Sequence, residues 1–275
     1  MSISTLMRIF GFHLLFFFLR YDMAASNPIV NFEGVSKNVT SVGFQEDCKF
    51  MFTGSEDCRV RIWDLSSNPV CKRMFDCLSP VTSVCLHPNQ VELAISTQAG
   101  SIYLWDVKSD NNEHLLPEIN ASIQCVDISP NGKYMAAVDN KGNCYIWTLG
   151  SNNASDQVTK TDPKLKLLAK GKYGLKVKFS PDSSLLVTTS GDSTARIYKA
   201  SDDFQLYREL KVDNNRWVWD ACFSNDSKYL FTASSDSVAR LWKIETKTIE
   251  REYIGHSKSL TSIAFRDTDQ NSQMR

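Results

Sequence analysis

Short apolar segments that end in an aromatic residue recur along this chain at a nearly constant interval. The five aromatic residues are Trp63, Trp105, Trp147, Tyr198 and Trp242. The intervals between them are 42, 42, 51 and 44 residues. Trp63 and Trp105 are followed directly by Asp64 and Asp106. Repetition at a fixed period of this size means that one structural unit is repeated and that neighbouring units share a core. This period constrains the fold more than any other feature of the sequence.

Each repeat contains four short segments in which apolar and polar residues alternate, as they do in half-buried β-strands. Turn sequences such as Ser129-Pro130-Asn131-Gly132 separate the segments. A period in the low forties that ends in Trp-Asp is typical of the blades of WD-repeat propellers, with four strands in each blade. The sequence therefore predicts an all-β WD-repeat β-propeller. Five complete four-stranded blades are expected at residues 38–75, 81–116, 123–169, 174–210 and 217–253.

Two lone strands are expected outside the complete blades. Residues 29–32 read as an outer strand, and residues 260–265, after Gly255-His256, read as an inner strand. An inner and an outer strand are not neighbours within a blade, so these two cannot pair in the usual ladder. A polar insertion at residues 150–163 explains the one long interval and is expected to be a surface loop.

The first 26 residues show no propeller pattern. They are predicted to form a separate leader, followed by the propeller at residues 27–267 and a disordered tail at residues 268–275. The apolar run at residues 9–19 is too short to cross a bilayer as a helix, so no membrane insertion is expected.

Two interpretations of the leader remain open. One is a signal peptide with a cleavage site at Ala24-Ala25-Ser26. Four glycosylation sequons would fit secretion, at Asn38, Asn120, Asn153 and Asn225. The favoured interpretation is an aberrant exon or gene-model segment that is foreign to the fold, because secretion would expose eight cysteines to an oxidising compartment. A cytoplasmic protein with reduced cysteines is predicted.

The charge balance disfavours nucleic acid as a partner. The 31 basic residues equal the 31 acidic residues in number, so no net field attracts polyanions.

No catalytic or metal-binding pattern stands out. The four histidines share no metal-ligand spacing, and no Cys-x-x-Cys motif occurs. Asp57, Asp192 and Asp236 recur in the turns between the second and third strands and are interpreted as structural. No enzyme activity, cofactor or metal is therefore expected.

The most suggestive surface element is Arg216-Trp217-Val218-Trp219, at the start of an inner strand. Alternation along a strand would put Trp217 and Trp219 on the same side. Either tryptophan could simply pack between blades. Trp217, at the mouth of the strand beside Arg216, is the better candidate for a protein-binding hot spot, where Trp and Arg are enriched.

Several runs of residues resemble one family closely. These runs are residues 42–44, 53–58, 61–65, 86–93, 134–138, 142–147 and 232–242. They lie in order across five blades, and with them residues 27–267 resemble the G-protein β-subunit-like proteins, the small propeller subunits of target-of-rapamycin kinase complexes.

The resemblance implies a seven-bladed ring without catalytic activity. It also implies binding to the catalytic region of a target-of-rapamycin-type kinase and its complex subunits, in a scaffold role. The tryptophan motif of the family matches Arg216, Trp217 and Trp219, which carries the kinase contact onto these residues. The chain departs from the family at its start, where the apolar segment stands in place of the opening strands.

A second class is a substrate-receptor propeller of a ubiquitin ligase, or another interaction scaffold. Such receptors often carry an arginine two residues after Trp-Asp. Here Leu65-Ser66 and Val107-Lys108 occupy those positions, which disfavours this class.

Overall fold

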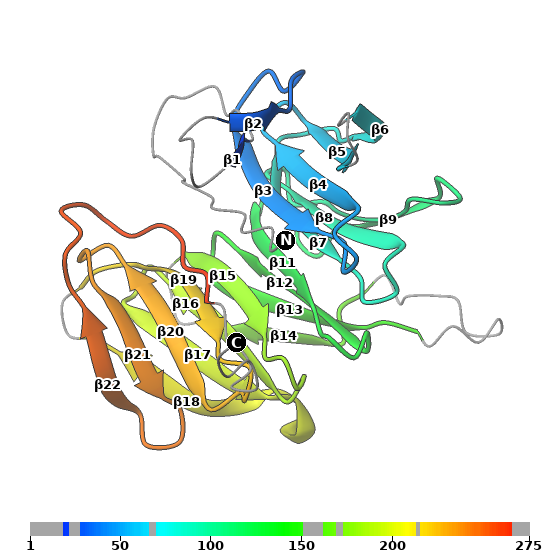
Figure 1. The fold of residues 1–275 in the computed structure, drawn as a ribbon. Helices are drawn as coiled ribbons and strands as arrows, with labels where there is room; N and C mark the ends of the chain where they lie inside the picture. The colour runs from blue at the N-terminus through cyan, green and yellow to red at the C-terminus, as the bar shows by residue number, and fades with distance from the viewer. Residues whose placement is uncertain are drawn as a thin grey trace, which may run out of the picture.

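The chain folds into five four-stranded antiparallel sheets that follow one another around an arc (Figure 1). This computed structural model describes residues 19–21, 28–65, 70–150, 162–168, 173–212 and 215–265. Within them, the one helical element is the three-residue 3-10 helix Ala200–Asp202. The prediction of five four-stranded blades in an all-β propeller fold is confirmed.

Strands are hydrogen-bonded in chain order within every sheet. The first sheet contains β3 (Val39–Phe44), β4 (Phe50–Ser55), β5 (Arg59–Asp64) and β6 (Val70–Asp76). The second contains β7 (Val81–Leu86), β8 (Glu92–Thr97), β9 (Ile102–Asp106) and β10 (Asn112–Leu115). The third contains β11 (Ile123–Ile128), β12 (Tyr134–Asp139), β13 (Asn143–Thr148) and β14 (Leu165–Leu168). The fourth contains β15 (Gly174–Phe179), β16 (Leu185–Ser190), β17 (Thr194–Lys199) and β18 (Gln205–Lys211). The fifth contains β19 (Val218–Phe223), β20 (Tyr229–Ser234), β21 (Ala239–Lys243) and β22 (Thr248–Tyr253).

The hydrophobic core lies between consecutive sheets. Trp105, Trp147, Tyr198 and Trp242, from the third strand of their sheets, each pack in the cluster shared with the preceding sheet. Trp63 of the first sheet instead packs edge-on against Phe32, with ring centroids 5.5 Å apart. In the second to fifth sheets, the repeated aromatic residue is therefore buried in the contact with the preceding sheet.

The inner strands β3, β7, β11, β15 and β19 lie side by side around the arc. They run in the same direction, as a residue later in one inner strand contacts a residue later in the neighbouring inner strand. Ser83 contacts Cys125 and Cys85 contacts Asp127, at 3.7 and 3.4 Å. Consequently all inner strands begin on the same face of the molecule.

A buried carboxylate ties three sheets together near the axis. Asp127 of β11 accepts hydrogen bonds from the Lys178 ammonium at 2.9 Å, the Phe179 amide at 2.8 Å and the Cys85 thiol at 3.4 Å. Burial raises the pKa of Cys85, so this thiol stays protonated and can donate. These hydrogen bonds hold the three inner strands β7, β11 and β15 in fixed positions relative to one another, and the loops at their ends are supported by them.

The strand expected at residues 29–32 is present but is paired. Residues 29–32 were expected to form a lone strand, but β2 (Pro28–Asn31) pairs antiparallel with β1 (Leu19–Tyr21). Three residues of the predicted leader thus supply the partner strand of β2, since an extended segment with an unpaired edge can accept another strand. Residues 1–18 and 22–27, with the proposed cleavage site, lie outside the described residues.

The C-terminal strand expected at residues 260–265 is not formed. Residues 254–265 contain no strand. They are attached to the fifth sheet by hydrogen bonds from the Leu260 amide to the Ser234 carbonyl, from the Ile263 amide to the Asp220 carboxylate and from the Ser259 hydroxyl to the Ser235 carbonyl, and Phe265 stacks on Phe231. A strand needs a neighbouring ladder for its amides, and this segment has none. Most of the insertion at 150–163 and the tail at 268–275 lie outside the described residues.

Candidate functional site

One face of the arc carries the connections between consecutive sheets. Because the inner strands are parallel and each sheet has four antiparallel strands, every fourth strand ends on the face where the next inner strand begins. We call it the linker face, and it comprises the described parts of the connections, at residues 77–80, 116–122, 173, 212 and 215–217, with residues 254–259 after the fifth sheet. The turns between the second and third strands lie on the same face.

An aromatic cluster lies on the linker face between the fourth and fifth sheets. Trp217 contacts Trp219 with ring centroids 5.2 Å apart, and it stacks on Tyr173 at 5.7 Å. Trp217 is 37% exposed and Tyr173 is 50% exposed. We call Tyr173, Trp217 and Trp219 the aromatic patch.

The backbone around Trp217 is held firmly. Its amide donates to the Ser235 hydroxyl at 2.9 Å, and its carbonyl accepts from the Ser235 amide at 2.9 Å. On the other side the ring covers Gly191, where an added Cβ would meet the indole at 3.3 Å. The side chain is therefore exposed on a rigid support, which lowers the entropic cost of binding a partner.

The rings of Trp217 and Trp219 are in contact, whereas the sequence predicted only that both would lie on the same side of a strand. Trp217 precedes β19 instead of starting it, and the register of β19 shifts between Val218 and Asp220, around Trp219. The indole N–H of Trp219 is buried and has no hydrogen-bond partner among the described residues. Arg216 is exposed next to Trp217. The structure thus brings Trp217 and Trp219 together, and it adds Tyr173, which no pattern in the sequence singled out.

The repeated Asp residues have a clear structural environment. Asp57, Asp192 and Asp236 each form an ion pair with the arginine four residues later, at 2.8, 2.7 and 2.7 Å. The arginines are Arg61, Arg196 and Arg240. Burial alone would raise the pKa of each aspartate, but the paired arginine and hydrogen bonds from neighbouring groups, above all the Thr194 hydroxyl at Asp192, outweigh it and lower the pKa. Sequence reasoning missed these partners, although the spacing Asp-x-x-x-Arg recurs in all three repeats.

The residues at the ends of the third strands also serve packing. Trp63 and Trp242 donate their indole N–H to Thr53 and Thr232, both at 2.9 Å. In the second repeat, Trp105 donates to Asp110 at 2.8 Å. Of the two aspartates that follow tryptophan, Asp64 pairs with Lys72 at 3.4 Å and Asp106 holds the next turn by accepting from the Lys108 amide at 2.7 Å.

The third repeat replaces the Asp–Arg pair with a different network. The Tyr145 hydroxyl contacts Glu118 at 2.7 Å and Asp139 at 2.9 Å. Glu118 also pairs with Lys141 at 3.1 Å and with Lys166. These hydrogen bonds, first that of Lys166 and then those of Tyr145 and Lys141, lower the pKa of Glu118 to about 2.

We expect the Glu118→Gln variant to melt at a lower temperature than the unmodified protein at pH 7. Because the folded-state pKa is depressed, the stabilisation is complete above the unfolded pKa of about 4.3 and is lost as the pH falls towards 2. The difference in melting temperature should therefore shrink over this range when unfolding is followed by circular dichroism. Glu245→Gln, at an exposed turn, is the control. A difference that does not change with pH would contradict the ionic role of Glu118.

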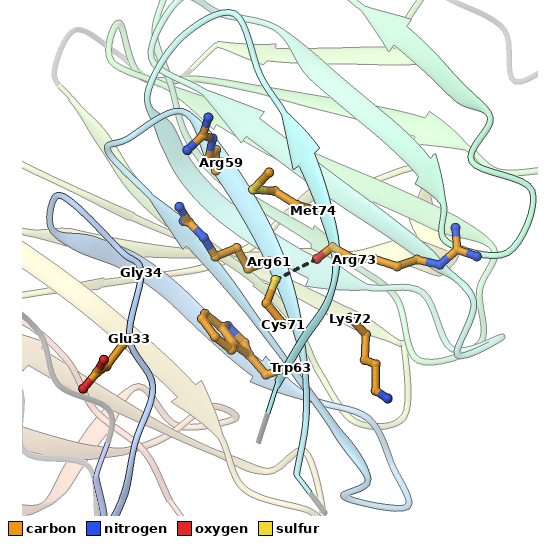
Figure 2. Close-up of a pocket in the computed structure, with 9 residues that line it drawn as sticks. All are labelled: Glu33, Gly34, Arg59, Arg61, Trp63, Cys71, Lys72, Arg73 and Met74. Atoms are coloured by element: carbon orange, nitrogen blue, oxygen red, sulfur yellow. Dashed lines mark hydrogen bonds between the residues drawn. The ribbon is translucent and has the colours of Figure 1, made fainter. Parts of the chain in front are cut away.

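A pocket of about 390 Å³ lies on the outer side of the first sheet (Figure 2). Figure 2 shows Arg59, Arg61 and Trp63 in a column along β5, facing the segment that contains Glu33. The pocket looks basic, but Arg59 and Arg61 are engaged by Asp76 and Asp57, both at 2.8 Å. Lys72 in the lining pairs with Asp64 at 3.4 Å, and Glu33 adds a negative charge. Because most of its basic side chains are already paired, the pocket has little attraction for an anionic ligand and is not our candidate site.

The described residues contain no group of three or more His, Cys, Asp or Glu side chains that could hold a metal ion. All eight cysteines are free thiols. Within the same ranges, no helix has the length and apolar character required to cross a membrane.

The family described as "WD domain, G-beta repeat" matches residues 26–64, 113–148, 173–199 and 204–243. The chain is 56% identical over 251 residues to "Protein LST8 homolog" of Drosophila pseudoobscura pseudoobscura, covering 90% of this chain and 78% of the relative. It is 48% identical over 258 residues to "Target of rapamycin complex subunit LST8" of Bos taurus, with the same two coverages. The protein of that name in Saccharomyces cerevisiae is 40% identical over 251 residues, covering 90% of this chain and 81% of the relative.

Proposed function

Because the chain belongs to the LST8 family of WD-repeat proteins, we propose that it is a non-catalytic scaffold subunit of a target-of-rapamycin complex. In this proposal the aromatic patch binds the catalytic region of the kinase of that complex and supports its active form. The names of the cow and yeast relatives, which are subunits of target-of-rapamycin complexes, support the assignment.

The single observation that carries the site is the half-exposed Trp217 on a rigid frame. Covering the exposed 37% of its side chain would remove about 90 Å² from water, which is worth about 2 kcal/mol. That is the contribution expected of an interface hot spot. Because Ser235 and Gly191 already fix the ring, little conformational entropy is lost on binding.

We also assign the protein to the cytoplasm as part of this proposal. Eight free thiols, two of them exposed, suit a reducing compartment better than an oxidising one.

Direct binding between purified proteins tests the proposal against its alternative. The chain is immobilised, and the affinities of a purified target-of-rapamycin-type kinase catalytic region and of a ubiquitin-ligase adaptor are measured by biolayer interferometry. We expect the kinase region to bind and the adaptor not to bind. Binding of the adaptor without binding of the kinase region would favour a substrate receptor and overturn the proposal.

A further inference from the structure

The segment at residues 260–265 occupies the place of a sixth inner strand beside the fifth sheet, although it belongs to no ladder. When the repeats are aligned, Leu260, Ile263 and Phe265 correspond to the first, fourth and sixth residues of the six-residue inner strands. Each of these three residues makes a contact with the fifth sheet that has a counterpart between an inner strand and the sheet before it.

The middle of the segment repeats a contact between the first two inner strands. The Ile263 amide donates to the carboxylate of Asp220, the third residue of β19, at 3.0 Å. In the same way, the amide of Val84, fourth in β7, donates to the hydroxyl of Ser41, third in β3, at 3.1 Å.

The start of the segment has a counterpart in the fourth sheet. The Leu260 amide donates to the carbonyl of Ser234, the last residue of β20, at 3.1 Å. Gly174, the first residue of β15, lies similarly close to the carbonyl of Asp139, the last residue of β12. A Cβ added to Gly174 would meet this oxygen at 2.9 Å.

The end of the segment matches as well. Phe265 stacks on Phe231, the third residue of β20, with ring centroids 4.5 Å apart. Phe179, the sixth residue of β15, shares a buried cluster with Ala136, the third residue of β12. The segment is therefore docked in the register of an inner strand from its first residue to its last.

The outer edge of the segment is open. The Ile263 amide faces β19, and because successive amides of an extended chain point to opposite edges, those of Ser262 and Ala264 face away from β19. In each of the five sheets this edge of the inner strand pairs with the second strand. In the part of the chain that the structure describes, neither the Ser262 nor the Ala264 amide donates a hydrogen bond. Such an edge is a template for an added strand.

The fifth sheet indicates which side chains an added strand needs. In the fourth sheet, the second strand β16 buries Leu186 in the cluster shared with the third sheet. The corresponding side of the fifth sheet carries Phe231 and Tyr253, whose ring centroids are 6.4 Å apart, and Tyr253 is still 42% exposed. Covering these rings requires apolar side chains at alternate positions. Residues 266–275 contain one apolar residue, Met274, and so lack this pattern.

We propose that the open edge of residues 260–265 is a strand-addition site, which binds an extended segment of a partner protein with apolar side chains at alternate positions. Main-chain hydrogen bonds with Ser262 and Ala264 supply the affinity, and Phe231 and Tyr253 select the side chains. The site goes beyond the proposed function, because it uses the side of the fifth sheet that faces away from the fourth sheet and from the aromatic patch.

A peptide with the sequence of residues 184–190, which contains β16, is the probe. In the fourth sheet Val187 pairs with Lys178, the fifth residue of its inner strand, which corresponds to Ala264. The control peptide carries Val187→Pro, which removes a ladder hydrogen bond. Fluorescence anisotropy of the labelled peptides measures their binding to the full chain and to its Ala264→Pro variant. Lys258→Pro, at an exposed position before the segment, is the control variant, and thermal unfolding checks that both variants fold.

We expect the probe to bind the unmodified chain at least tenfold more tightly than the control peptide does. Ala264→Pro should weaken binding of the probe at least tenfold, and Lys258→Pro should leave it unchanged. Failure of the probe to bind, or equal binding of both peptides, would overturn the strand-addition site. The proposed function would stand, since kinase binding is measured separately.

Two other occupants of the edge would give distinct results. A dimer in sedimentation velocity that Ala264→Pro dissociates would assign the edge to a second copy of the chain. Probe binding that appears only after Phe16→Asp and Phe18→Asp, in and next to the apolar run of the leader, would assign it to the chain's own N-terminal residues. Either result would overturn the proposal of a partner strand.

Discussion

Replacing Asp57 with alanine should lower the free energy of unfolding by about 3–5 kcal/mol, because it leaves a buried guanidinium without its counter-charge. Asp57 and Arg61 are both only 4% exposed, and the two carboxylate oxygens accept from both terminal nitrogens of Arg61, at 3.2 and 2.8 Å. The cost comes mainly from the desolvated charge that remains. Urea unfolding followed by fluorescence measures the change.

The same strand provides an internal control. Arg59 and Asp76 form an ion pair at the same 2.8 Å distance, but their side chains are 45% and 66% exposed. Asp76→Ala should therefore change stability by less than about 1 kcal/mol, as is usual for surface pairs. Equal effects of Asp57→Ala and Asp76→Ala would show that burial does not determine the value of these pairs. The double variant Asp57→Ala with Arg61→Met should recover part of the loss, since it removes both buried charges.

Replacing Trp217 with alanine should weaken binding to the kinase catalytic region by about 30-fold or more, which corresponds to a loss of about 2 kcal/mol. The ring is the part of the aromatic patch that reaches solvent while it stacks on Tyr173 and touches Trp219. Removing it also withdraws support from both neighbours, so the loss exceeds that of a peripheral contact. Titration by biolayer interferometry gives the affinity.

Leu206→Ala is the control for Trp217→Ala, because Leu206 is also half-exposed but lies at the start of the outer strand β18. Its affinity should be unchanged. Both variants should keep the cooperative melt of the unmodified protein, since neither side chain belongs to a buried cluster. Unaltered kinase binding by a folded Trp217→Ala variant would show that the aromatic patch is not part of the interface.

The periodic features were predictable because each depends on residues close in sequence. Alternating apolar positions and polar turns sufficed for the twenty strands of the five sheets, and the regular interval of the aromatic residues located the third strand of each sheet. The strand beyond each end of the repeats was predicted less well. β2 found a partner in Leu19–Tyr21, and residues 260–265 formed no strand, since strand formation at an edge depends on which other segment reaches it.

The aromatic patch shows the same division. The motif Arg216-Trp217-Val218-Trp219 was visible in the sequence, because tryptophans at the mouth of an inner strand stand out there. Tyr173 lies 44 residues from Trp217 and joins it only because the fourth and fifth sheets pack side by side. Local patterns define strands and turns through short-range backbone and side-chain preferences, whereas a binding face is a property of distant residues that packing brings to the same side.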